Sequence, residues 1–128
     1  MRKQKIAMTL LMLAMLLPAA GCFLAVAAGG AAGTVAYVKG DFEAVEEGTV
    51  AEIYDAAVKA LEDLKIAVIS KQQDALVAQV EGRNAEDKKV SVKIEAQDEG
   101  LCKLSIRIGT FGDQTQSRMI YEKIKEYR

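Results

Sequence analysis

Two segments in the second half of the chain alternate between apolar and polar residues, and this alternation limits the fold more than any other feature. From Val90 in KKVSVKIEA (88–96), and from Cys102 in LCKLSIRI (101–108), every second residue is apolar. A period of two puts the apolar side chains of a strand on one face and leaves the other face in water. The short turn at 97–100 cannot hold a crossover, so we expect these two strands to be antiparallel neighbours.

Three further segments are typical of strands. IAVISK (66–71) and ALVAQVEG (75–82) are rich in β-branched residues and are separated by a short polar turn. TVAYVKGDFEAVEE (34–47) is also β-prone, and Gly40 within it predicts a bend or a bulge. The short links after residue 66 predict an antiparallel meander.

Two amphipathic helices complete the domain. Thr49-x-x-Glu52 forms a capping box, and the helix that it begins, over about 50–64, carries its apolar residues at helical spacing. Asp113 has the character of an N-cap for a second helix over 114–127, with Gln116 at its third position. The residues expected to face the core of the domain are Val50, Ile53, Tyr54, Ala57, Leu61 and Leu64 in the first helix, Ile120, Ile124 and Tyr127 with nearby Met119 in the second, and Phe111 in the loop before it.

The resulting order, β-α-β-β-β-β-α, predicts an α+β fold. Two helices can cover the apolar face of one antiparallel sheet, which makes a two-layer sandwich. The other face of that sheet would carry charged side chains and is expected to be either solvated or a partner surface. Its charged residues would be Lys89, Lys93, Glu95, Lys103 and Arg107.

The first 33 residues have a different character. MRKQK is basic, residues 6–17 are apolar, and Pro18-Ala19-Ala20-Gly21 supplies small residues before Cys22. No charged residue occurs from Ile6 to Val38. This arrangement is typical of a secretory signal peptide. The Cys that follows it resembles the bacterial lipobox, which implies a diacylglyceryl group on the Cys22 thiol, cleavage before Cys22 and acylation of the new amine.

These observations divide the chain into a lipoprotein signal peptide (1–21), an Ala/Gly-rich tether (22–33) and an α+β domain (34–128). The alternative is an uncleaved single-pass anchor, because residues 6–28 are long enough to span a bilayer. The expected location is the bacterial cell envelope, with the domain on the periplasmic side. By the lipoprotein sorting rule, Phe23 in place of Asp after the Cys favours the outer membrane over the inner one.

Four stretches together resemble a known family. Cys22 after the leader, AAGTVAYVKG (31–40), IYDAAVKALEDLKI (53–66) and IRIGTFGDQTQS (106–117) are similar to an uncharacterised family of small bacterial lipoproteins, classed as a domain of unknown function. The GTFGD…S stretch is the most specific part of this resemblance. The resemblance implies a lipoprotein location and no established activity.

The inventory of reactive side chains is poor. The chain has no His, which excludes Ser-His-Asp and Cys-His catalysis, and its two Cys are too few for a typical structural zinc site. With Cys22 acylated, Cys102 would be a small buried hydrophobic residue, and Glu43, Glu46 and Glu47 are expected to form a solvated edge. We therefore predict no catalytic residue, no metal and no cofactor.

The charge of the chain does not favour nucleic acid as a partner. Loss of residues 1–21 would remove three basic and no acidic side chains, so the net charge of −1 would become about −4. A mildly acidic domain lacks the basic surface that attracts phosphate backbones. The expected partners are membrane lipid, through acylated Cys22, and an envelope protein.

GTFGDQTQS (109–117) is the densest polar cluster of the chain. Arg107, Thr110, Asp113 and Ser117 are candidate contacts for an anion, a small ligand or a partner, because the start of a helix offers free amides to an anion. The structural alternative assigns the glycines to a tight turn and Asp113 to the helix cap. Three hypotheses for function follow: a lipid-anchored interaction module, a small-ligand or anion binder, and a single-pass membrane-anchored protein; an enzyme is not expected.

Overall fold

The computed structural model describes residues 32–128. The predicted signal peptide, Cys22 and all but the last two residues of the predicted tether lie outside the described residues. The elements of the described part are β1 (Val35–Val38), β2 (Asp41–Glu47), α3 (Val50–Asp63), β3 (Ala67–Gln73), β4 (Val77–Arg83), β5 (Lys89–Ala96), a 3-10 turn η1 (Asp98–Gly100), β6 (Leu101–Ile108) and α4 (Gln114–Glu126).

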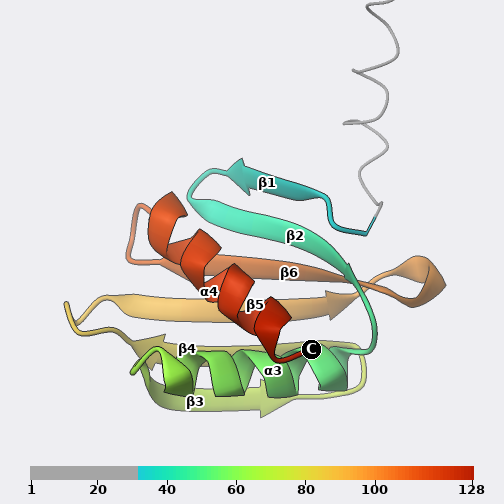
Figure 1. Ribbon diagram of the computed structural model, residues 1–128, viewed down its shortest axis with the longest axis horizontal. Coiled ribbons are helices and arrows are strands. Elements are labelled where there is room, and N and C mark those ends of the chain that lie inside the picture. The colour runs from blue at the N-terminus through green and yellow to red at the C-terminus, as the bar shows by residue number, and fades with distance from the viewer. Residues whose placement is uncertain (1–31) are drawn as a thin grey trace, which may run out of the picture.

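The strands form one antiparallel sheet in the order β1-β2-β6-β5-β4-β3. β3 to β6 are the predicted meander, and β2 adds to it by pairing with β6, with Ala44 opposite Leu104. Both helices lie on one face of the sheet, α3 over β3, β4 and β5, and α4 over β2 and β6 (Figure 1). The predicted two-layer α+β fold is confirmed.

The bend expected at Gly40 is a hairpin. Lys39 and Gly40 have φ angles of 52° and 90°, so the segment 34–47 folds back and contributes two paired strands to the sheet. Positive φ at both central residues is the requirement of a type I′ turn, whose twist matches that of the strands that it joins. The residues on either side of the turn, Val38 and Asp41, are partners in the pairing.

Side-chain bonds begin both helices, as the sequence predicts. The Thr49 hydroxyl accepts from the Glu52 N–H at 3.2 Å, and a Glu52 carboxylate oxygen accepts from the Thr49 N–H at 2.9 Å, which completes the capping box. In α4, a carboxylate oxygen of Asp113 accepts from the Gln116 N–H at 2.9 Å. Each cap satisfies N–H groups that the first turn of a helix leaves without a partner.

The core lies between the sheet and the helices. The inward residues of β4, β5 and β6 pack against α3 and α4 as the period of two predicts, and most are at most 2% exposed. The predicted core face of α4 needs correction, because Met119 and Tyr127 are 52% and 42% exposed. The buried stripe of α4 follows i, i+3, i+4, i+7 spacing and consists of Ser117, Ile120, Tyr121 and Ile124.

Candidate functional site

Arg107 joins three segments of the chain at one end of the sheet. Its guanidinium donates to the Lys39 carbonyl at 3.0 Å, to the Asp41 carboxylate at 3.1 Å and to the Thr110 carbonyl. The β1–β2 turn, β2 and the loop after β6 are therefore held together by one cation. These bonds occupy much of the hydrogen-bonding capacity of the guanidinium and neutralise its charge.

The four candidate contact residues do not form one site. Arg107 and Thr110 line an open groove on the helix-free face of the sheet, whereas Asp113 caps α4 and Ser117 is fully buried beneath that helix. The Ser117 Oγ has no partner among the described residues. Asp113 also accepts from the Gln116 side-chain amide at 3.2 Å, so its carboxylate already has donors. The structure thus brings together only the first two of the four.

The groove beside Arg107 has a volume of about 680 Å³. It lies between the end of β6 and the β4–β5 hairpin, a region that sequence patterns did not single out as a site. Its lining consists of Gln79, Glu81, Arg83, Asp87, Lys88, Lys89, Ser91, Arg107, Gly109, Thr110 and Phe111.

Acidic neighbours accompany the cations of the groove. Lys89 lies 3.0 Å from Glu81, and Lys88 lies 2.9 Å from Glu86, whose hydrogen bond raises the pKa of the Lys88 ammonium. Arg83 donates to the Asp87 carbonyl at 2.8 Å. An anion entering the groove would have to compete with these carboxylates for the cations. For metal ions, residues 32–128 contain no cluster of suitable side chains.

The loop that supplies Thr110 adopts an unexpected orientation. Phe111 was expected in the core, but this prediction is wrong because its side chain is 90% exposed. The loop sits against the β1–β2 turn, and a Cβ added to Gly112 would lie 2.1 Å from the Gly40 carbonyl oxygen and 2.6 Å from its Cα. This close approach of two backbones fixes the loop over the hairpin, and the Phe111 ring points away from the protein.

The helix-free face of the sheet carries a ladder of ion pairs. Diagonal positions on paired strands place Lys103 2.8 Å from Glu43 and Lys89 3.0 Å from Glu81, and Lys93 lies 2.9 Å from Glu95, two positions along β5. The hydrogen bond that Lys103 donates to Glu43, together with the charge of that carboxylate, raises the pKa of Lys103. With Arg107 and Asp41 at the end, these pairs join β2 to β6 and β5 to β4, so this face is polar, ordered and uncovered by either helix.

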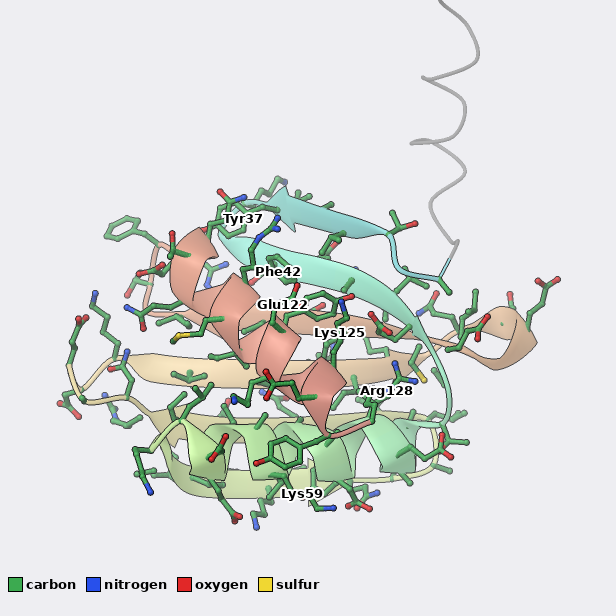
Figure 2. All side chains as sticks on the ribbon, viewed as in Figure 1. Tyr37, Phe42, Lys59, Glu122, Lys125 and Arg128 are labelled. Atoms are coloured by element: carbon green, nitrogen blue, oxygen red, sulfur yellow. The ribbon has the colours of Figure 1, made fainter. Side chains whose placement is uncertain are left out.

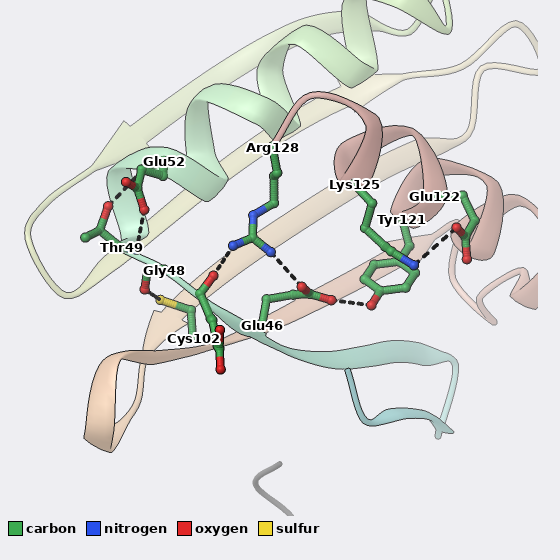
Figure 3. Close-up of polar contacts among 10 residues, drawn as sticks. Glu46, Gly48, Thr49, Glu52, Cys102, Tyr121, Glu122, Lys125 and Arg128 are labelled. Atoms are coloured by element: carbon green, nitrogen blue, oxygen red, sulfur yellow. Dashed lines mark hydrogen bonds and ion pairs between the residues drawn. The ribbon is translucent and has the colours of Figure 1, made fainter. Parts of the chain in front are cut away.

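Glu46 is the polar residue whose position the sequence interpretation missed. The expectation of a solvated edge is wrong for this residue, which is 9% exposed beneath α4. Tyr121 donates its hydroxyl to one carboxylate oxygen, and the Arg128 guanidinium donates to the other at 2.6 Å (Figure 3). Burial and the Glu46 carboxylate raise the pKa of Tyr121 far above its usual value. The sequence does carry a signal for this burial. In a strand, Glu46 falls on the same face as the apolar residues Phe42 and Ala44, so it points toward the core.

The positively charged end of α4 also contacts this cluster. Lys125 lies in the last turn of α4, and Arg128 is the second residue after that helix. Lys125 Nζ lies 5.2 Å from the centre of the Tyr121 ring (Figures 2 and 3). A cation over an aromatic face is attracted by the ring quadrupole. Phe42 packs on the same ring with a centroid distance of 5.2 Å, so the cluster is continuous with the core.

Cys102 is buried, as expected. It is 2% exposed on the inward face of β6, and its thiol donates to the Gly48 carbonyl at 3.3 Å (Figure 3). Burial raises the pKa of the thiol, which disfavours the reactive thiolate. Within residues 32–128, this geometry offers no activated nucleophile at Cys102.

The comparisons with known proteins identify a family and no curated relative. A family model described as "Protein of unknown function (DUF3568)" matches residues 5–127. No curated protein matches the chain. Neither helix within residues 32–128 has the length and hydrophobicity that crossing a membrane requires.

Proposed function

The chain belongs to DUF3568, a family of proteins of unknown function, and we propose that it is a lipid-anchored bacterial envelope protein whose α+β domain serves as a protein-interaction module. The observation that carries the interaction role is the helix-free face of the sheet. Its charged side chains are held in ion pairs on β-strands, so a partner meets a surface that is already ordered. We propose no catalytic role, because the chain has no His and the buried Cys102 lacks activation.

Lipid anchoring is supported by the order of features at the N-terminus. A basic start, an apolar segment and small residues precede Cys22, and acylation there would attach the domain through residues 22–33. Several acyl chains are needed for a stable anchor, since each buried methylene contributes only about 0.8 kcal/mol. The domain would then face the periplasm, with the outer membrane favoured by Phe23.

Metabolic labelling with a palmitate analogue tests the anchor. The wild-type protein should carry the label and begin at Cys22 by mass spectrometry, whereas Cys22→Ser should remain unlabelled with residues 1–21 attached. A wild-type protein that retains residues 1–21 would refute the lipoprotein and favour the single-pass anchor over residues 6–28.

Site-specific photocrosslinking in intact cells tests the interaction face. A photoreactive residue in place of Ser105, at the centre of the helix-free face, should give a discrete protein adduct, and one in place of Lys59, exposed on α3, should not (Figure 2). Exchanging Lys103 and Glu43 inverts the charge at both positions, so it should abolish the adduct. Thermal unfolding would measure the cost of the carboxylate that the exchange places opposite Glu95, and the variant should still fold. Identical adducts from positions 59 and 105 would contradict the proposal.

The groove beside Arg107 and Thr110 favours a second candidate, a weak anion binder. Calorimetric titration with inorganic phosphate would detect it, and Lys89→Gln should weaken the binding because Lys89 lines the groove. Lys59→Gln provides the matched loss of charge away from the groove. No heat of binding in the wild-type protein would eliminate this candidate.

A further inference from the structure

The outer edge of β1 has the properties of a strand that pairs with another chain. β1 ends the sheet, and within residues 32–128 no strand pairs with its outer side. Its residues, Val35 to Val38, include no charge and no Pro, and its pairing with β2 has no register shift. Charges, prolines, bulges and very short strands are the usual means by which an edge avoids pairing, and of these Val35–Val38 shows only the short length of four residues.

The opposite edge of the sheet is protected. β3 has a register shift between Val68 and Ser70, and Lys71 lies next to its central residue, Ser70. Both features disfavour the addition of a strand. The two edges of one sheet therefore differ, and only β1 offers a regular, uncharged template.

The hydrogen bonds to β2 determine which backbone groups of β1 point outward. The Thr34 carbonyl accepts from the Val45 N–H at 3.0 Å, so the backbone of Thr34 faces β2. Successive residues of an antiparallel strand direct their N–H and C=O groups to opposite sides. The groups of Val35 and Tyr37 therefore point to the free edge.

We propose that β1 pairs with β1 of a second copy of this chain, antiparallel, around a two-fold axis at Ala36. In this register Val35 of one copy lies opposite Tyr37 of the other, and their outward groups form a reciprocal pair of hydrogen bonds on each side of the axis. The two Ala36 residues meet at the axis as a non-hydrogen-bonded pair, where Cα atoms approach to about 4.5 Å and small side chains fit.

The side chains of β1 suit a copy of the same strand. Val35 and Tyr37 share a face with Ala44 and Phe42, and they are 41% and 36% exposed. The proposed register places each beside the other across the axis, which is a favourable β-branched and aromatic pair. Identical charged strands would repel one another across a two-fold axis, but β1 carries no charge.

The proposed dimer rests on the proposed membrane anchor, which would raise the local concentration of the chain. A contact between four-residue strands is smaller than the roughly 1,200 Å² that a stable complex buries, so it requires a high local concentration. Cys22 precedes Val35 by 13 positions in the sequence, so anchoring to one membrane through acylated Cys22 would confine both copies to the same layer. The dimer is thus expected on the membrane.

Cysteine crosslinking of the full-length protein in its native membranes tests the pairing. Ala36→Cys should give a covalent homodimer on mild oxidation, because the two residues meet at the axis. Gln72→Cys, exposed on the β3 edge, is the matched control and should remain monomeric. The parent protein contains only Cys22 and Cys102, so it shows how much covalent dimer forms without an introduced cysteine. No homodimer from Cys at position 36, or an equal yield from position 72, would overturn the inference.

A second pair of variants tests the hydrogen bonds. Both variants are made in the Ala36→Cys protein. Val35→Pro removes an outward N–H, which an edge strand tolerates, and should abolish the crosslink at position 36. Val35→Thr keeps the N–H and the shape of the side chain, so it should retain the crosslink. Equal thermal midpoints would show that both variants fold. Persistence of the homodimer with Val35→Pro, or crosslinking at position 36 to a different protein, would refute the pairing. Palmitate labelling of the same samples reports separately on the anchor.

Discussion

The Arg128 guanidinium reaches back to Glu46, with Nη1 2.6 Å from Oε2, and so ties the last residue of the chain to a strand 82 positions earlier. Their side chains are 23% and 12% exposed. Tyr121 donates to the other carboxylate oxygen, and Arg128 also donates to the Glu47 carbonyl. This half-buried cluster, together with the apolar stripe of α4, holds that helix over β2.

Glu46→Gln should destabilise the domain by about 2 kcal/mol, measured by urea unfolding, because it leaves the Arg128 cation without its charged acceptor. Glu43→Gln is the matched control. It breaks an ion pair with Lys103 that is roughly one-third exposed, so the loss should stay below about 1 kcal/mol. Equal losses from the two variants would contradict the importance of burial at Glu46.

Tyr121→Phe should cost about 1–2 kcal/mol in the free energy of unfolding, because the Glu46 carboxylate loses a donor. The substitution also tests pH dependence. The pKa of Tyr121 is raised in the folded state, so the unfolded chain releases its proton first as pH rises above about 10. Stability should therefore fall in that range in the wild type, and this component should be absent from the Phe variant. Parallel pH profiles for the two proteins would disprove the assignment.

Gly112→Ala should disrupt the loop after β6. The added Cβ would overlap the Gly40 backbone, and φ is +81° at this position, so the loss should exceed the roughly 1–2 kcal/mol of a positive φ alone. Gly100→Ala isolates the effect of φ, since φ is +74° there and no atom lies within 4 Å of the new Cβ. Thermal unfolding of the two variants would measure the difference, and similar midpoints would argue against a backbone contact at Gly112.

Cys102 should resist thiol reagents until the domain unfolds. Burial raises the pKa of its thiol and limits access to it, so both factors slow attack. A Cys introduced at Ser105, half-buried on the helix-free face, should react readily in the native protein and serves as the control. Rapid modification of Cys102 without denaturant would show that β6 opens in the native state.

Local patterns predicted most of the elements because they depend on neighbours within a few residues. The period of two at 88–108 determined which residues of β5 and β6 face inward, and the Thr49 and Asp113 caps marked where α3 and α4 begin. Gly40 indicated the place where the first β segment turns. The correct α+β class followed from the order of these elements.

The candidate site could not be assembled in the same way. Arg107 and Asp113 are six positions apart in the sequence, yet one lies on the helix-free face and the other caps a helix on the opposite side of the sheet. Their separation depends on the direction that the chain takes after β6, which the Gly112–Gly40 contact sets. The groove was missed because its lining comes from the β4–β5 hairpin, the end of β6 and the loop after it, and the hairpin is distant in sequence from the other two.

The sequence by itself determined the period, caps and turns of this protein, because each is decided by backbone and side-chain preferences within a few residues. Only the tertiary structure decided that β2 pairs with β6, that Phe111 points outward, and that Glu46 is covered by α4. These features depend on packing between segments far apart along the chain. The physical environment of a side chain such as Glu46 is therefore set by the elements that close over it.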